Sequence, residues 1–96
     1  MPLQVVESDD VVRGNHAHKA LSQIIFAVSG IIDFELENTA GEKYSFKLDK
    51  PDMGLYIPPM HWRIIKFSHN AVLLCLASDV YDENDYIRNY QDFKQK

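Results

Sequence analysis

The fold is decided in residues 31–48, which have the sequence IIDFELENTAGEKYSFKL. Apolar residues alternate with acids in the first part, and with Lys and Ser in the last part. A period of two is typical of a β-strand with one buried and one solvated face. The segment NTAG between the two parts contains Asn and Gly, which tolerate the positive φ of a turn. We therefore expect a β-hairpin with strands at residues 31–37 and 42–48, in which lysines face acids across the ladder.

Short strands are expected along most of the remaining chain, separated by turn residues. The further strand candidates are residues 3–6, 11–18, 23–29, 55–57, 61–67 and 71–78. Only residues 82–94 have a helical pattern, with Tyr86, Tyr90 and Phe93 on one face and acids near the start. This pattern predicts an all-β fold, an antiparallel jelly roll with one C-terminal helix, formed by residues 1–96 as a single domain.

Composition narrows the possible partners and the location. Ten basic and fourteen acidic residues give a formal net charge of −4, which argues against a nucleic-acid surface. No apolar run is long enough to span a membrane, and the start lacks the pattern of a signal peptide, so we expect a cytoplasmic protein without a membrane partner. The only cysteine, Cys75, lies in the apolar run AVLLCLA and is expected in the core.

The candidate site is the segment RGNHAHK at residues 13–19. On a strand, His16 and His18 point to the same face, so two imidazoles are aimed at one place. Such a pair suits either a metal site or acid/base chemistry, and the plainer alternative is two partly buried, hydrogen-bonded histidines. The neighbouring cations, Arg13 and Lys19, favour an anionic ligand over that plainer alternative.

An HxH pair on a strand of a small jelly roll resembles the cupins. The metal-binding cupins add a Glu about five residues later and a His from a later strand. This chain has Gln23 and Arg63 at those positions, a poor ligand and a cation, and His61 is the only substitute nearby. We therefore favour acid/base chemistry without a metal or other cofactor, and a metal-dependent cupin stays the less favoured alternative.

Three motifs resemble a narrower family, the sugar nucleotide 3,4-ketoisomerases of bacterial deoxysugar pathways. They are RGNHAHK, GLYIPPMHW at residues 54–62 and LASDVYDENDYIRNYQDF at residues 76–93, so the resemblance covers residues 13–93. It implies an RmlC-like cupin homodimer that needs no metal. The implied substrate is a dTDP-linked 4-keto-6-deoxy sugar, whose keto group moves between C4 and C3 through an enediolate.

The resemblance also implies roles for individual residues. The catalytic acid and base are His16 and His18. The expected substrate-binding residues are Arg13, Lys19, Gln23, Tyr56, Trp62 and Arg63. The tail residues expected to lock the helix onto the barrel are Tyr81, Asp82, Asp85, Tyr86 and Arg88. His69 is expected in an exposed turn.

The sequence departs from the family at its start. Family members have a longer N-terminal segment, with strands exchanged between subunits and an active-site tyrosine in an aromatic strand. Here residues 3–6 are LQVV, without a tyrosine. We therefore expect the N-terminal strands of the family to be absent, which leaves a sheet edge unpaired. The alternative to an isomerase is a shortened homologue, a sugar-nucleotide-binding cupin without catalysis.

Overall fold

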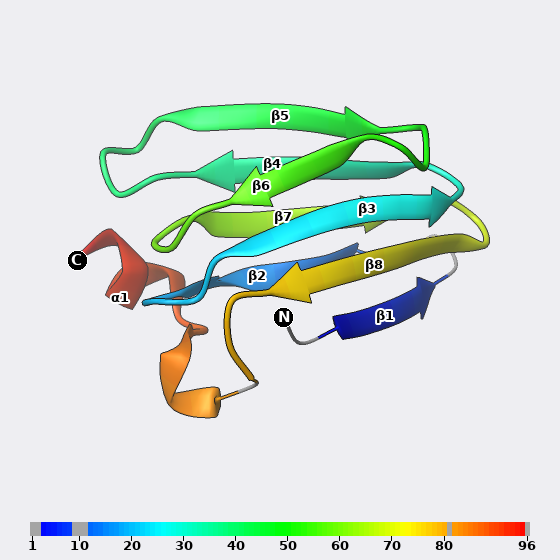
Figure 1. The fold of residues 1–96 in the computed structure, drawn as a ribbon. Coiled ribbons are helices and arrows are strands. Elements are labelled where there is room, and N and C mark those ends of the chain that lie inside the picture. The colour runs from blue at the N-terminus through cyan, green and yellow to red at the C-terminus, as the bar shows by residue number, and fades with distance from the viewer. Residues whose placement is uncertain (1–2, 9–11, 81, 96) are drawn as a thin grey trace.

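The computed structural model describes the backbone of residues 3–8, 12–80 and 82–95, and the side chains of residues 14–80 and 82–95. Two antiparallel sheets, named sheet I and sheet II, lie face to face with the core between them (Figure 1). A short helix lies at the C-terminal end of the chain (Figure 1). The expected all-β antiparallel fold with a terminal helix is confirmed.

The strand order shows how the chain passes between the two sheets. Sheet I has the order β1 (Leu3–Ser8), β8 (Ala71–Ala77), β3 (Gln23–Ser29) and β6 (Gly54–Ile57). Sheet II has the order β5 (Lys43–Leu48), β4 (Ile32–Glu37), β7 (Trp62–Phe67), β2 (Val12–His18) and β9 (Tyr86–Ile87). Every strand candidate from the sequence is present, but β9 was not expected.

The core lies between the inner faces of the two sheets. Its buried side chains are Ile25, Ala27, Ile32, Phe34, Leu36, Leu48, Leu55, Ile57, Ile65, Phe67, Ala71, Leu73 and Cys75. Burial of such side chains is the main favourable contribution to folding, at about 25 cal/mol per Å² of apolar surface. Cys75 is a core residue, as expected.

The hairpin of β4 and β5 has the expected register, with Asp33 opposite Lys47 and Glu37 opposite Lys43. Two of its aromatic residues differ from expectation, because Tyr44 and Phe46 are 42% and 41% exposed. They lie on β5, the edge strand of sheet II, and the opposite sheet ends there in β6, which has only 4 residues. The alternation predicted the strand correctly but not its place at the edge.

The expected helix at residues 82–94 is mostly wrong. The segment contains a 3₁₀ turn, η1 (Glu83–Asp85), then β9, and only then the helix α1 (Tyr90–Lys94). Two helical elements start in this segment, each at its own N-cap. Asp82 caps η1 by accepting a hydrogen bond from the amide of Asn84, and Asn89 caps α1 by accepting from the amides of Gln91 and Asp92. Between these caps, β9 pairs with β2 instead of continuing a helix.

The helix α1 covers the outer face of sheet II. Phe93 is fully buried there in a cluster with Ala17, Trp62 and Ile87. The ring of Tyr90 contacts Trp62 edge to face, with centroids 5.3 Å apart. Within the described chain, no helix is long and apolar enough to cross a lipid bilayer.

Candidate active site

Strand β2 aims both histidines at the interior of the barrel. His16 lies opposite Arg63 of β7, and His18 lies opposite Tyr86 of β9. A bulge between Gly14 and His16, with φ values of 93° and 55° at Gly14 and Asn15, bends the strand just before the pair. The two imidazole rings are 5.0 Å apart and nearly perpendicular. The expectation that both histidines share one face is confirmed.

His16 is a neutral base at pH 7. Its Nδ1 lies 3.2 Å from the carbonyl oxygen of Gly14, and a carbonyl only accepts, so Nδ1 carries the proton. Burial, followed by the nearby charge of Arg63, lowers the pKa of His16 to about 4. The other ring nitrogen, Nε2, is therefore left as a proton acceptor.

His18 has the same protonation state but a different partner. Its side chain is 1% exposed, and its Nδ1 donates to Oδ2 of Asp85 at 3.2 Å. Burial and then the charge of Arg63 lower the pKa of His18 to about 4, although Asp85 acts in the opposite direction. Nε2 of His18 is buried without a hydrogen-bond partner in residues 14–80 and 82–95.

Arg63 is a buried cation without a matching anion. Its side chain is 1% exposed, and Nη1 donates a hydrogen bond to the amide oxygen of Gln23. Burial lowers the pKa of Arg63 to about 10, so the guanidinium stays charged at pH 7. Nε and Nη2 have no partner among the described residues. Buried charges are normally paired, so this arrangement suits an anionic or oxyanionic ligand.

Two further residues join the pair, and sequence reasoning assigned them to a different role. Asp85 accepts hydrogen bonds from His18 and from the amides of Ala20 and Leu21, at 2.9 and 3.2 Å. The ring of Tyr86 lies 5.0 Å from that of His16 and 4.4 Å from that of His18. Both were expected to lock a helix onto the barrel. The N-caps Asp82 and Asn89 were the signal in the sequence that Asp85 and Tyr86 do not belong to one continuous helix.

Three of the predicted binding residues, Lys19, Tyr56 and Trp62, are not gathered at the histidines. Trp62 points to the outer face of sheet II, and Tyr56 is 58% exposed on the outer face of sheet I. Lys19 is exposed, and only its backbone amide contacts this region, by donating to the carbonyl of Asp85 at 2.9 Å. The side chain of Arg13 and all of Tyr81 lie outside the described residues. Gln23 and Arg63 are the two that the fold brings to the pair.

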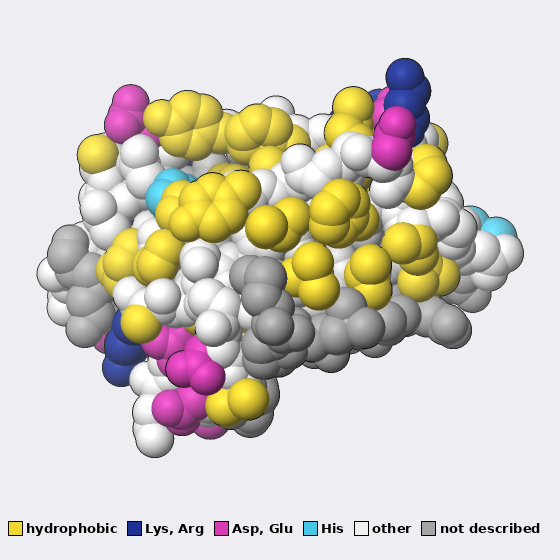
Figure 2. Space-filling model, viewed as in Figure 1, with side chains coloured by type: hydrophobic (Ala, Val, Ile, Leu, Met, Phe, Trp, Pro, Cys, Tyr) yellow, Lys and Arg dark blue, Asp and Glu magenta, His cyan; other side chains and the backbone are white. Residues whose placement is uncertain are grey.

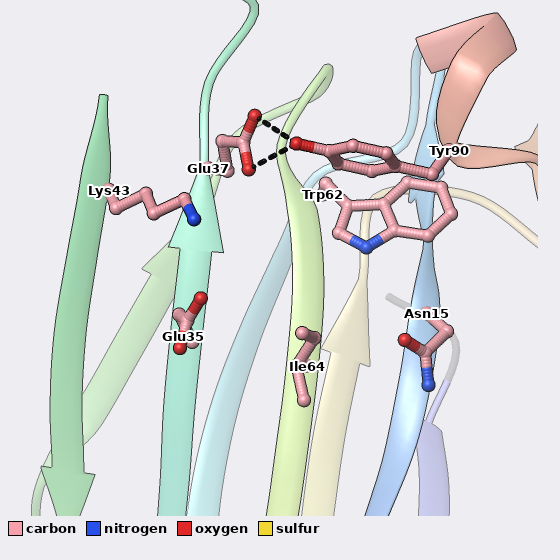
Figure 3. A pocket seen from close by; sticks show the side chains of 7 residues that line it. All are labelled: Asn15, Glu35, Glu37, Lys43, Trp62, Ile64 and Tyr90. Atoms are coloured by element: carbon pink, nitrogen blue, oxygen red, sulfur yellow. Dashed lines mark hydrogen bonds between the residues drawn. The ribbon is translucent and has the colours of Figure 1, made fainter. Parts of the chain in front are cut away.

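A separate hollow of about 260 Å³ lies on the opposite, outer face of sheet II (Figure 3). It is lined by Asn15, Glu35, Glu37, Lys43, Trp62, Ile64 and Tyr90. Glu37 accepts hydrogen bonds from the hydroxyl of Tyr90 at 2.8 Å and from Nζ of Lys94 at 2.9 Å. Burial raises the pKa of Glu37, but these two bonds outweigh burial and lower it. This carboxylate is satisfied by the protein itself.

Known proteins share both the sequence and the fold. The family model described as FdtA, WxcM-like, C-terminal, matches residues 4–96. The TDP-4-oxo-6-deoxy-alpha-D-glucose-3,4-oxoisomerase of Aneurinibacillus thermoaerophilus is 42% identical over 84 residues, which are 86% of this chain and 60% of that relative. This chain thus spans 60% of the length of that curated relative.

Solved structures give the same result. QdtA, a sugar 3,4-ketoisomerase from Thermoanaerobacterium thermosaccharolyticum in complex with TDP, has a TM-score of 0.91 and 37% identity, covering 98% of this chain and 70% of its own. WlaRB, a TDP-quinovose 3,4-ketoisomerase from Campylobacter jejuni, has a TM-score of 0.92 and 40% identity, covering 99% and 75%. CapF of Staphylococcus aureus, at 18% identity, shares the fold alone, with a TM-score of 0.80 over 88% of this chain and 25% of its own. The chain belongs to the FdtA family, as a WxcM-like, C-terminal domain.

Proposed function

We propose that this chain is a sugar nucleotide 3,4-ketoisomerase, which moves the keto group between C4 and C3 of a dTDP-linked 4-keto-6-deoxyhexose. The observation that carries the proposal is the pair of neutral imidazoles, 5.0 Å apart, beside a guanidinium of Arg63 whose Nε and Nη2 have no partner among the described residues. The Aneurinibacillus relative, QdtA and WlaRB are 3,4-isomerases of sugars, and a QdtA mutant has been solved with TDP-4-keto-6-deoxyglucose.

The reaction consists of two proton transfers without net oxidation. The C3–H bond breaks and a C4–H bond forms, while the hydroxyl proton moves from O3 to O4 through an enediolate. His16 and His18 both keep an unprotonated Nε2 when Nδ1 donates to Gly14 and Asp85. Each imidazole accepts one of the two protons and returns it to the neighbouring atom, so the reaction needs no cofactor.

Arg63 supports the intermediate that these transfers create. An enediolate carries negative charge on its oxygens, and a fixed guanidinium in a water-poor site stabilises such charge strongly. Arg63 lies opposite His16 in the sheet and its charge lowers the pKa of both His16 and His18, which supports a role at the reacting end of the site. We propose Arg13 and Lys19 as contacts of the diphosphate, because they flank the pair in β2 and just after it.

A homodimer is the second part of the proposal. The outer face of sheet I is apolar: Ile24 lies opposite Leu76 and Phe26 opposite Leu74, and all four are only partly buried. Figure 2 shows apolar side chains gathered across this face. Large exposed apolar faces are uncommon in monomers. Light scattering should give twice the chain mass for the native protein and a lower mass for Phe26→Lys; a native monomer would contradict the dimer.

The activity is tested by NMR with dTDP-4-keto-6-deoxyglucose in D₂O. We expect deuterium at C3 or C4 and formation of the 3-keto product. His16→Asn and His18→Asn should each slow both by about 10² to 10⁴. His69→Asn, in an exposed turn, is the matched control and should match the native rate. No exchange above the double variant would contradict the isomerase, and binding of TDP without exchange would support the non-catalytic alternative.

A further inference from the structure

Gln23 is the only described residue that contacts the guanidinium of Arg63 by a hydrogen bond. Gln23 lies on β3 of sheet I and Arg63 on β7 of sheet II, so the bond crosses the interior of the barrel. Both side chains are buried, with exposed fractions of 9% and 1%. The amide therefore fixes the position of the guanidinium from the opposite sheet.

The orientation of this amide is fixed as well. Nε2 of Gln23 donates to the Sγ atom of Cys75 at 3.2 Å, which leaves Oε1 facing Arg63. Rotating the amide by half a turn would place its NH₂ group against the guanidinium, and both groups only donate. Gln23 can thus support Arg63 in one orientation alone.

The bond to Gln23 occupies Nη1, while Nε and Nη2 on the other edge of the guanidinium are buried without a partner among the described residues. Nε and Nη2, the two unpartnered nitrogens, form the side of the group that binds an oxyanion in a bidentate manner. A carboxylate at position 23 would reach the same group but would also cancel its charge. A neutral amide positions the cation without cancelling it.

We infer that Gln23 is a positioning residue, whose neutral amide holds Arg63 in place and keeps its charge available for the oxygens of the enediolate. This inference rests on the proposed isomerase. It predicts that Gln23→Glu stabilises the free protein but weakens its interaction with the anionic intermediate. The new carboxylate pairs with a buried cation and so stabilises the free protein, while the other edge of Arg63 loses its affinity for a second anion.

Three variants test the inference: Gln23→Glu, Gln23→Leu and, as the matched control for the added charge, Gln91→Glu on the exposed surface of α1. Thermal unfolding without ligand should give a Tm for Gln23→Glu at or above the native value. Gln23→Leu should unfold at a lower temperature, because it leaves Nη1 of Arg63 unpaired. Gln91→Glu should match the native protein in both Tm and turnover.

Turnover gives the second readout. For Gln23→Glu we expect kcat to fall by about 10² to 10³ and KM to change by less than about threefold, because the lost interaction belongs to the transition state. A kcat near the native value, or a Tm as low as that of Gln23→Leu, would overturn the inference. If the native protein turns nothing over, the proposed function fails, while the order of the three Tm values still decides whether Gln23 is a neutral clamp on Arg63.

Discussion

Among its described side chains, sheet II carries one buried charge on each face, Glu37 outside and Arg63 inside, and the two charges have different surroundings. On the outer face, Glu37 is 6% exposed and accepts hydrogen bonds from Tyr90 and Lys94. On the inner face, Arg63 is 1% exposed, and the one hydrogen-bond partner of its guanidinium within residues 14–80 and 82–95 is the neutral amide of Gln23. A buried charge with its full set of partners stabilises the protein that contains it, whereas a buried charge without them indicates a ligand. The hydrogen-bond partners of Glu37 and Arg63 among the described residues, more than their burial, distinguish these two charges.

The contrast between Arg63 and Glu37 is tested most directly by removing the charge of Arg63. Arg63→Met should lower kcat by about 10² to 10³, because the enediolate loses its cation. The same change should leave stability unchanged or raise it by about 1 to 4 kcal/mol, because an apolar side chain replaces an unpaired buried charge. Denaturant unfolding and steady-state kinetics measure the two effects. A clear loss of stability would mean that Arg63 is a structural residue like Glu37.

As the pH falls, the inner face of sheet II should lose its contribution to stability before the outer face does. The folded pKa of His16 and His18 is about 4, below the unfolded value of 6.5, so the unfolded chain binds protons first as pH falls. Stability should therefore decrease between pH 6.5 and pH 4, by at most about 1.4 kcal/mol per pH unit for each histidine. Glu37 has a lowered pKa and contributes stability above the ordinary glutamate pKa of 4.5, which is lost only at lower pH.

Denaturant unfolding at half-unit pH steps measures both windows. The double variant His16→Gln, His18→Gln should flatten the curve between pH 6.5 and pH 4 and leave the decrease at lower pH. A native curve that is flat above pH 4.5 would show that the histidines are not buried as neutral groups.

The outer face should respond in stability alone. Glu37→Gln weakens the contacts with Tyr90 and Lys94 and should cost about 1 to 2 kcal/mol in the free energy of unfolding. It should leave kcat within about twofold of the native value, since Glu37 lies on the far face of the sheet from the histidines. A larger fall in kcat would connect the hollow in Figure 3 to the active site.

The smallest effect is expected at a charge pair that is exposed to solvent. Arg88 donates two hydrogen bonds of 2.8 Å to Glu83, and both side chains are about half exposed. Glu83→Gln should cost less than about 0.5 kcal/mol, because solvent screens exposed pairs. Thermal unfolding at low and high salt checks this, and a loss above 1 kcal/mol would show that η1 depends on the pair.

Most of the fold was predictable from local patterns. Turn residues bound the strands, and the alternation in β4 fixed both the strand and its buried face. The same alternation in β5 could not reveal that Tyr44 and Phe46 lie at an edge, because edge position depends on strand order. The tail was predicted as a helix because Tyr86, Tyr90 and Phe93 have helical spacing, yet pairing with β2 overrides that spacing at Tyr86.

The site was partly predictable in the same sense. The period of a strand placed His16 and His18 on one face, and the resemblance to a family drew attention to Gln23 and Arg63. Neither source indicated that Gln23 contacts Arg63 across the barrel, since that contact joins two sheets. Asp85 was also missed, because a hydrogen bond between residues 67 positions apart leaves no local pattern.

The pairing of β2 with β9 has a consequence for biosynthesis. His16 is positioned by β7, but His18 depends on Asp85 and Tyr86, which follow it by most of the length of the chain. Contacts of such long sequence separation form late, because the loop between them must close first. A chain emerging from the ribosome therefore contains the residues of β2 long before it contains the partners of His18. Asp85 and Tyr86, which are synthesised long after β2, complete the surroundings of His18.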